Sequence, residues 1–300
     1  MAINTGNFAK ALYPGVNFWY GKSYNEFKTQ YTDLFETKSS KRAWEEVVSQ
    51  SGYGLAQVIG EGATVPFDVE RQGFIDRATH VEYGLGAIIT KNMYEDDLYD
   101  VVMEKKGKGL GRSVHQVRET VGANVFNRAF NTSYTFGDGK ALLVSDHPNI
   151  AGGTWSNVPS VAADISEAAL EQACIDIGKY TDDRGLKIAV KPKGLVIPID
   201  LDFETNKILK TEYEVGTANN TVNIVRSRFP MGATINNYLT DTDAWFIKTD
   251  VPDGAIYWER SAPAFTMDND FDTDNAKFKV KARFSFMVAD KKQWYGSAGA

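Results

Sequence analysis

The hydrophobic pattern changes character along the chain, and the first 50 residues do not follow the pattern of a compact core. Aromatic and aliphatic side chains crowd together in residues 8–20, interrupted by Pro14 and Gly15. In residues 24–35 apolar positions recur at steps of three and four, which is the stripe of an amphipathic helix. This helix either packs on its own domain or belongs to an arm that lays its stripe on a neighbouring subunit.

Short β-like segments separated by glycines follow in residues 52–90. Residues 55–59 and 80–83 are two such segments, with turn residues between them. We interpret the region as a long two-stranded excursion. Because an isolated two-stranded ribbon is marginally stable in water, it needs a further surface to lie on, either its own body or another chain.

A long helix is predicted next. Asp96 and Asp97 place negative charge at its start, where the helix dipole favours it, and apolar residues then recur at helical spacing as far as Phe130. If it continues to Asn131, it is about 50 Å long at 1.5 Å per residue. The glycine-rich run 107–111 predicts a kink or break, since each interior glycine costs about 1 kcal/mol relative to alanine.

The rest of the chain mixes helices and strands and predicts an α+β fold. We expect a helix at 165–180, a buried strand at 194–199, a short helix at 203–209 and a long strand at 276–288. Apolar side chains alternate along the last of these, at Phe278, Val280, Ala282, Phe284 and Phe286.

Composition narrows the function classes. A net charge of −6 over 300 residues argues against a protein that grips nucleic acid over a wide surface. Cys174 is the single cysteine, which excludes an intrachain disulfide and suits a reducing cytoplasm. No stretch approaches the ~18 consecutive apolar residues that cross a bilayer, and residues 1–15 lack a secretory signal pattern. We expect a soluble cytoplasmic protein that contacts no membrane.

Catalytic motifs are missing from the sequence. With three histidines and one cysteine, it contains no C-x-x-C, H-E-x-x-H or G-x-S-x-G. Asp146 and His147 resemble an acid–base pair, but Pro148 follows and residues 145–160 are loop-like, so a turn histidine is expected. The run 107–111 follows a predicted helix and lacks the G-K-[ST] ending of a phosphate-binding loop. We therefore expect neither an enzyme nor a cofactor.

One acidic cluster is the weak candidate for a metal site, at Asp268, Asp270, Asp272 and Asp274. A calcium loop of the EF-hand type needs glycine at its sixth position and an acid at its twelfth. The two possible registers offer Thr273 with Lys279, or Asn275 with Lys281. Both fail, so a solvated acidic turn is favoured. An opportunistic cation site, and with it a calcium-dependent enzyme or binding module, is the remote alternative.

A series of short motifs, each weak alone, occurs in a characteristic order along the chain. They are Ala11-Leu12-Tyr13-Pro14-Gly15-Val16, Gly60-Glu61-Gly62, Gln72-Gly73-Phe74, Tyr83-Gly84-Leu85-Gly86, Ile89-Thr90-Lys91, Glu95-Asp96-Asp97, Asn127-Arg128-Ala129-Phe130, Asp138-Gly139-Lys140, Asp146-His147-Pro148-Asn149, Gly152-Gly153, Ala244-Trp245-Phe246 and Trp294-Tyr295-Gly296-Ser297. Because of these motifs and their order, the chain resembles the major head subunit of Mu-like phages and prophages. That family has the Hong Kong phage type of coat fold, shared by tailed phages and herpesviruses.

The resemblance implies a division of the chain into five parts. They are an N-terminal arm at 1–50, an extended β-hairpin loop at 51–90, a peripheral domain with a long spine helix at 91–160, an axial domain at 161–255, and return strands of the peripheral domain at 256–300. The neighbouring subunit then supplies the surface that the marginal ribbon lacks.

The resemblance also implies a structural function. The chain would assemble with itself into hexamers and pentamers of an icosahedral head that encloses the phage genome, in the bacterial host cytoplasm and then in the virion. Scaffolding or protease, portal and decoration proteins are the implied partners, with non-specific contact to packaged DNA. An encapsulin-like nanocompartment shell is the alternative.

Inter-subunit contacts are expected on the arm and the loop. Buried aromatic residues dominate interfaces, which favours Phe18, Trp19 and Tyr20 on the arm. Glu61 and Arg71 are the candidates on the loop. Some relatives weld neighbouring subunits through a lysine on this loop, but residues 51–90 contain no lysine, so a shell held without covalent cross-links is expected.

Overall fold

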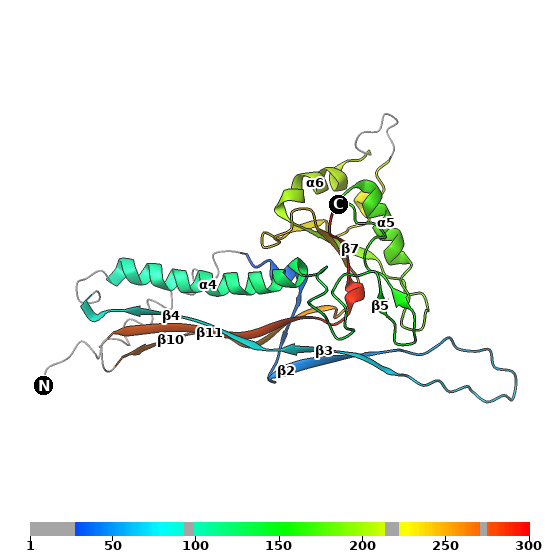
Figure 1. The fold of residues 1–300 in the computed structure, drawn as a ribbon, viewed down its shortest axis with the longest axis horizontal. Helices are drawn as coiled ribbons and strands as arrows, with labels where there is room; N and C mark the ends of the chain where they lie inside the picture. Colours follow the sequence, from blue (N-terminus) through cyan, green and yellow to red (C-terminus); the bar gives the residue numbers. More distant parts are fainter. Residues whose placement is uncertain (1–27, 93–98, 214–221, 271–274) are drawn as a thin grey trace. The chain divides into compact units, whose positions relative to one another are not determined.

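The protein is α+β, as the sequence predicts, in a computed structural model that describes residues 28–92, 99–213, 222–270 and 275–300 (Figure 1). Its elements form two compact units. The first unit takes its described residues from Met1–Trp44, Thr79–Gly122 and Tyr257–Phe286. The second unit takes them from Glu45–Ala78, Ala123–Ile256 and Met287–Ala300.

The first unit is a helix lying along a four-stranded sheet (Figure 1). The strand order is β1 (Glu36–Ser39), β10 (Ala255–Asn269), β11 (Ala276–Val288) and β4 (Val81–Ile89). β4 and β11 pair antiparallel. Ile89 lies opposite Ala276 at one end of the paired region, and Val81 lies opposite Phe284 at the other. The helix is α4 (Tyr99–Asn127).

Strand β11 buries one face and exposes the other. Phe278, Val280, Ala282 and Phe284 are buried, whereas the lysines between them are exposed. The predicted strand at 276–288 is confirmed, and its alternation is confirmed as far as Phe284, whereas Phe286 is only half-buried. The period of two holds up to Phe284, where one face of the sheet is covered and the other is solvated, and it ends at the next residue, which is buried too.

Aromatic side chains form part of the core of the first unit around residues 31–35. Tyr31, on the single turn α2 (Tyr31–Leu34), lies 4.9 Å from Tyr257 between ring centroids, and Phe35 lies 4.8 Å from Phe286. A Cβ on Gly122 would approach the Phe286 ring to 3.1 Å, so a side chain at this position of α4 would crowd the cluster.

Two helix predictions need correction. Helix α4 runs unbroken through 107–111, so the predicted break is wrong. Leu110 and Val114 are buried in the core, and tertiary packing of this kind overrides weak local propensity. In residues 28–35 the helix predicted over 24–35 is reduced to α2, after which Phe35 is extended. The predicted helix start, Asp96 and Asp97, lies outside the described residues.

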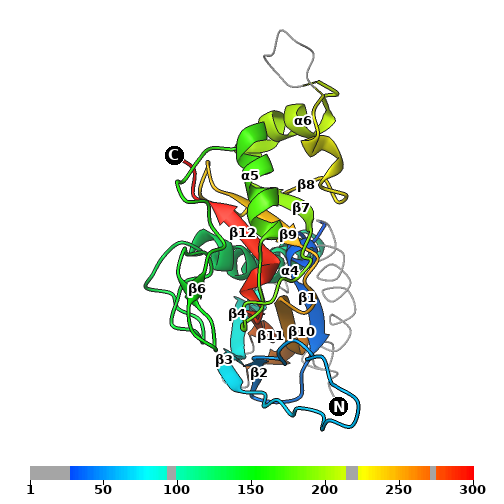
Figure 2. The same ribbon diagram turned by 90° about the vertical axis from the view of Figure 1, so that its right-hand side faces the viewer.

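The second unit is built on another four-stranded sheet, ordered β12 (Trp294–Ser297), β9 (Trp245–Thr249), β7 (Pro192–Ile197) and β8 (Ala233–Ile235). β7 pairs parallel with β8 and antiparallel with β9. Helices α5 (Glu167–Gly178) and α6 (Asp202–Lys210) lie beside this sheet (Figure 2). Together they confirm the predicted helices at 165–180 and 203–209 and the strand at 194–199.

The core of the second unit joins these helices to the sheet. Its buried members are Ile165, Leu170, Ala173, Ile177, Tyr180, Val190, Leu195, Ile197, Ile208, Val225, Phe229, Trp245, Ile247 and Tyr295. Ser166 caps the start of α5, because its side chain accepts a hydrogen bond from the Ala169 N–H. Local capping and the apolar stripe of α5 therefore act together.

Two short ribbons complete the second unit. β2 (Trp44–Gln50) pairs with β3 (Gln72–Thr79), and β5 (His147–Pro148) pairs with β6 (Thr154–Trp155). The two strands predicted for the excursion over 52–90 are wrong, because the ribbon that forms is β2 with β3 and β2 ends before residue 52. Residues 55–59 are not a strand, and residues 81–83 belong to β4, which pairs with β11.

Gly137 fixes β3 within the second unit. Its N–H donates to the carboxylate of Asp76 at 2.7 Å, and a Cβ at this position would lie only 2.2 Å from the carbonyl oxygen of Ile75. No side chain fits without moving the strand, because backbone atoms cannot rotate away.

We predict that Gly137→Ala lowers the free energy of unfolding by about 1–3 kcal/mol, the usual cost of overpacking. Urea unfolding of the unassembled subunit measures it. Gly178→Ala is the matched control, since Gly178 lies in α5 and a Cβ there meets nothing within 4 Å, and this variant should be at least as stable as the wild type. Equal stability of the two variants would contradict the account.

Candidate assembly surface

A long loop connects β2 to β3, and we call residues 51–71 the extended loop (Figure 1). At its base the Ser51 N–H donates to the carbonyl oxygen of Arg71 at 3.0 Å. At its tip the Ala63 N–H donates to the carbonyl oxygen of Gly60 at 3.0 Å, and Gly62 has φ +80°. A positive φ at the third residue marks a type II turn, which requires glycine there. All residues of the loop are described, and they form no strand.

The extended loop exposes an unusual number of large apolar side chains. Seven of them are exposed: Tyr53, Leu55, Val58, Ile59, Val65, Phe67 and Val69. Val58 is 102% exposed and Phe67 is 96% exposed, so the loop does not bury these side chains on its own unit. Single exposed apolar residues are ordinary, but a concentration of them on one projecting segment marks an interaction surface.

The strand at the base of the loop is anchored by a buried ion pair. The Lys291 Nζ lies 2.5 Å from Oδ2 of Asp76, and both side chains are less than one tenth exposed. The other oxygen of Asp76 accepts the Gly137 N–H, and the Lys291 ammonium lies 5.4 Å from the Phe136 ring centroid. Both carboxylate oxygens of Asp76 thus accept a hydrogen bond, which favours a buried pair.

The first unit contains a second anchor, which holds the N-terminal segment to α4. Both carboxylate oxygens of buried Glu119 accept backbone N–H groups, from Gln30 at 2.9 Å and from Tyr31 at 3.0 Å. Burial, the largest influence, raises the pKa of Glu119 above its ordinary value, although the two N–H donors oppose this shift. Glu119 thus fixes the segment at Gln30 and Tyr31 to α4.

The residues predicted for inter-subunit contacts are separated. Glu61 lies in the tip turn of the extended loop and Arg71 at its base, and both are exposed. Phe18, Trp19 and Tyr20 lie outside the described residues. The sequence predicts a strand at the apolar segment 55–59 and does not predict that the apolar side chains of the whole loop are exposed.

His147 is a structural residue in the second unit. Its ring is fully buried and stacks on Trp155 at 4.7 Å between centroids. Nδ1 lies 2.7 Å from Oδ2 of Asp138, and Nε2 lies 3.2 Å from the carbonyl oxygen of Leu142. Burial opposes ionisation of Asp138, but the His147 hydrogen bond and the Lys291 charge outweigh it and lower its pKa. Both ring nitrogens are engaged, so the ring has no free nitrogen to offer a substrate.

The acidic cluster is only partly described. Asp268 belongs to β10, and Asp270 follows it and pairs with Lys277 at 2.8 Å. Asp272 and Asp274 lie outside the described residues. Among the described residues, no group of three or more histidine, cysteine or acidic side chains is arranged to hold a metal ion.

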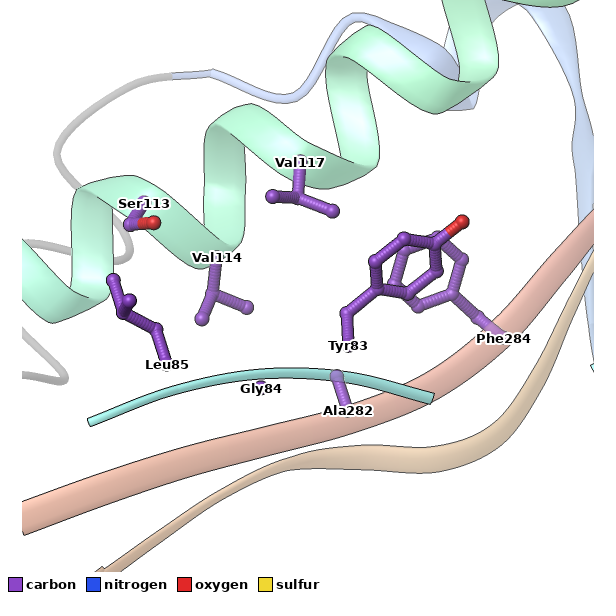
Figure 3. Close-up of a pocket in the computed structure, with 8 residues that line it drawn as sticks. All are labelled: Tyr83, Gly84, Leu85, Ser113, Val114, Val117, Ala282 and Phe284. Carbon is purple, nitrogen blue, oxygen red and sulfur yellow. The ribbon is translucent and has the colours of Figure 1, made fainter. Parts of the chain in front are cut away.

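One apolar pocket lies between α4 and the strands β4 and β11 of the first unit (Figure 3). Its volume is about 200 Å³, and it is lined by Tyr83, Gly84, Leu85, Ser113, Val114, Val117, Ala282 and Phe284. The Tyr83 and Phe284 rings stack at 4.7 Å between centroids. A pocket with so few polar groups lacks the converging acids, bases and donors of a catalytic site.

Comparison with known proteins decides the family. The family model described as phage capsid protein matches residues 76–297. The chain belongs to the phage capsid protein family. No curated protein matches it in sequence. Among the described helices, none combines the length and apolar character needed to span a membrane.

Solved capsid structures share the fold of this family member. The capsid of a native GTA particle matches with a TM-score of 0.58 at 11% identity, covering 91% of this chain and 90% of that one. The procapsid of bacteriophage JBD30 gives 0.51 at 14% identity, covering 98% and 76%. The virus-like particle from Pyrococcus furiosus gives 0.52 at 11% identity, covering 94% and 97%. The fold is therefore that of tailed-phage capsid proteins.

The raised pKa of Glu119 gives a pH prediction. The folded protein binds this proton more tightly than the unfolded chain, so the contribution of Glu119 to stability falls as pH rises from its ordinary value of 4.5 through the raised pKa. Glu119→Gln cannot ionise. In urea titrations from pH 4 to 7, the stability of the variant should improve relative to the wild type as pH rises. Parallel pH profiles would contradict this.

Proposed function

We propose that this phage capsid protein is a major head subunit of the Mu-like, Hong Kong phage type, which assembles with itself into the hexamers and pentamers of an icosahedral shell. The exposed apolar side chains of the extended loop are the observation that supports this most strongly. Closed rings require head-to-tail contacts, in which one surface of a subunit meets a different surface of the next. A projecting apolar loop on a folded subunit suits such a contact.

The exposed side chains of the extended loop offer apolar area that association can bury. Full burial of one large apolar side chain stabilises an interface by roughly 1.5–3 kcal/mol. The seven exposed side chains of the loop can therefore supply a substantial share of the association energy, even after the entropy lost on docking is subtracted. Obligate interfaces of this kind bury thousands of Å².

The proposal divides the chain as the family resemblance implies. An arm at 1–50, with Phe18, Trp19 and Tyr20, and a loop at 51–90, with Glu61 and Arg71, contact neighbours. A peripheral domain at 91–160 is completed by return strands at 256–300, and an axial domain at 161–255 surrounds the ring centres. The protein then acts as a structural component and not as an enzyme.

The partners follow from the same role. The shell encloses the phage genome, which contacts it non-specifically, and it meets scaffolding or protease, portal and decoration proteins during assembly in the bacterial host cytoplasm. A nanocompartment shell of the encapsulin type is the second candidate, supported by the similarity to the virus-like particle. The contents of particles purified from cells distinguish the two, since a phage head holds DNA and a nanocompartment holds protein cargo.

We predict that Val58→Ser combined with Phe67→Ser raises the concentration needed for assembly at least about tenfold, since each change removes an apolar side chain worth more than 1.4 kcal/mol when buried. Sedimentation velocity over a concentration series measures it. Both positions are exposed in the subunit, so thermal unfolding should not change. The control is Val161→Ser, which alters a side chain that is 77% exposed outside the loop. Equal assembly of both variants would contradict the role of the loop.

A further prediction concerns the chemistry of the shell. Because residues 51–90 contain no lysine, particles boiled in detergent and reductant should run as a single band of the monomer. A ladder of cross-linked multimers on the same gel would show covalent welding and refute the non-covalent shell.

A further inference from the structure

The extended loop is held to its own unit by one arginine. The Arg184 Nη1 donates to Oδ2 of Asp68 at 2.7 Å, and Nη2 donates to the carbonyl oxygen of Val69 at 2.6 Å. Both acceptors lie on the limb of the loop that returns to β3. The two bonds use the rigid planar fork of the guanidinium, which a lysine ammonium does not reproduce.

The same carboxylate joins the two limbs of the loop. The Gly54 N–H, on the outgoing limb, donates to Oδ2 of Asp68 at 2.8 Å. A Cβ on Gly54 would lie 3.3 Å from that oxygen and 3.5 Å from Nη1 of Arg184, so glycine permits the close approach. The Gly54 N–H first, and the Arg184 side chain second, lower the pKa of Asp68 below its ordinary value. The carboxylate therefore stays charged across the neutral range.

Arg184 itself is presented by a well-defined turn of the second unit. Oδ1 of Asp182 accepts the N–H groups of Arg184 and Leu186, both at 2.8 Å. Gly185 has φ +82°, a conformation that favours glycine. The residues on either side of the turn are held at the hydrophobic core, because Tyr180 is buried there and its carbonyl oxygen accepts the Ile188 N–H. The guanidinium thus stands on a fixed support.

We propose that Arg184 is a positioning residue for assembly, which fixes the direction of the extended loop in the free subunit so that the loop can dock on a second copy of this chain. This inference rests on the proposed function. The contacts involve only positions 54, 68 and 69, near the base of the loop, and they leave Val58 and Phe67 fully exposed.

This geometry indicates that Arg184 orders the loop for docking and does not hold the loop in an inactive state. A contact that parked the loop in an inactive state would cover its apolar side chains, since these provide the surface for docking. The Arg184 contact orders the backbone and leaves that surface open. Ordering a binding segment before it meets its partner reduces the entropy lost on association and so favours binding.

The first test reads the contact in the unassembled subunit. Hydrogen exchange of the Gly54 amide reports its bond to Asp68, and chymotryptic cleavage after Tyr53 or Phe67 reports mobility of the loop. Both rates should rise about tenfold in Arg184→Ala, as expected for loss of local order, and less in Arg184→Lys. Arg226→Ala is the matched control, because Arg226 forms an exposed ion pair with Glu212 at 3.2 Å, and both rates should stay as in the wild type. Unchanged rates in Arg184→Ala would overturn the proposal.

The second test reads assembly by light scattering at equal subunit concentrations. Arg184→Ala should assemble about 5- to 10-fold more slowly, because an unordered loop docks less often, while its thermal unfolding stays as in the wild type. Faster assembly of this variant would mean that the contact restrains the loop, and would overturn the proposal. Equal rates would overturn the role of Arg184 and leave the capsid function intact. A wild-type chain that does not assemble would contradict both.

Discussion

The main physical constraint on this subunit is that the extended loop must stay ordered while its apolar side chains are exposed to water. The extended loop forms no strand, and Val58 and Phe67 gain nothing from their own unit. Such a segment is stable only where its ends are fixed by other interactions, and it becomes favourable when a partner covers it. The second unit meets the first requirement with polar contacts at the ends of the loop, and a neighbouring subunit would meet the second.

The ends of the loop are fixed by polar contacts that are dispersed in sequence. Asp76 at the base is held by Lys291 and by the Gly137 N–H, and the limbs are held by Asp68 and Arg184. The first of these pairs is buried and therefore resists salt, whereas the second is partly exposed and is screened by it. The loop thus combines a rigid base with a limb contact that is sensitive to solution conditions.

Sequence reasoning succeeded where local pattern and tertiary packing agree. The alternation of Phe278, Val280, Ala282 and Phe284 predicts both the strand and its buried face. Helix α5 was equally predictable from its apolar face. It failed where packing overrides local preference. Gly107 and Gly109 weaken α4 locally, yet the helix continues because Leu110 and Val114 are buried beside them.

The candidate site was less predictable, for a physical reason. Arg184 and Asp68 are 116 residues apart, and Lys291 and Asp76 are 215 apart. No periodicity connects such pairs, and only the folded chain brings them together. The apolar residues of the loop were visible in the sequence, but a solvent-exposed segment without a partner strand cannot be told from a buried strand by hydrophobicity alone.

Whether the chain assembles with itself is the central question, and size-exclusion light scattering combined with negative-stain electron microscopy of the purified chain tests it most directly. Rings of five or six subunits, tubes or closed shells are the predicted result. A chain that stays monomeric at high concentration, and also in the presence of its scaffolding protein, would contradict the account.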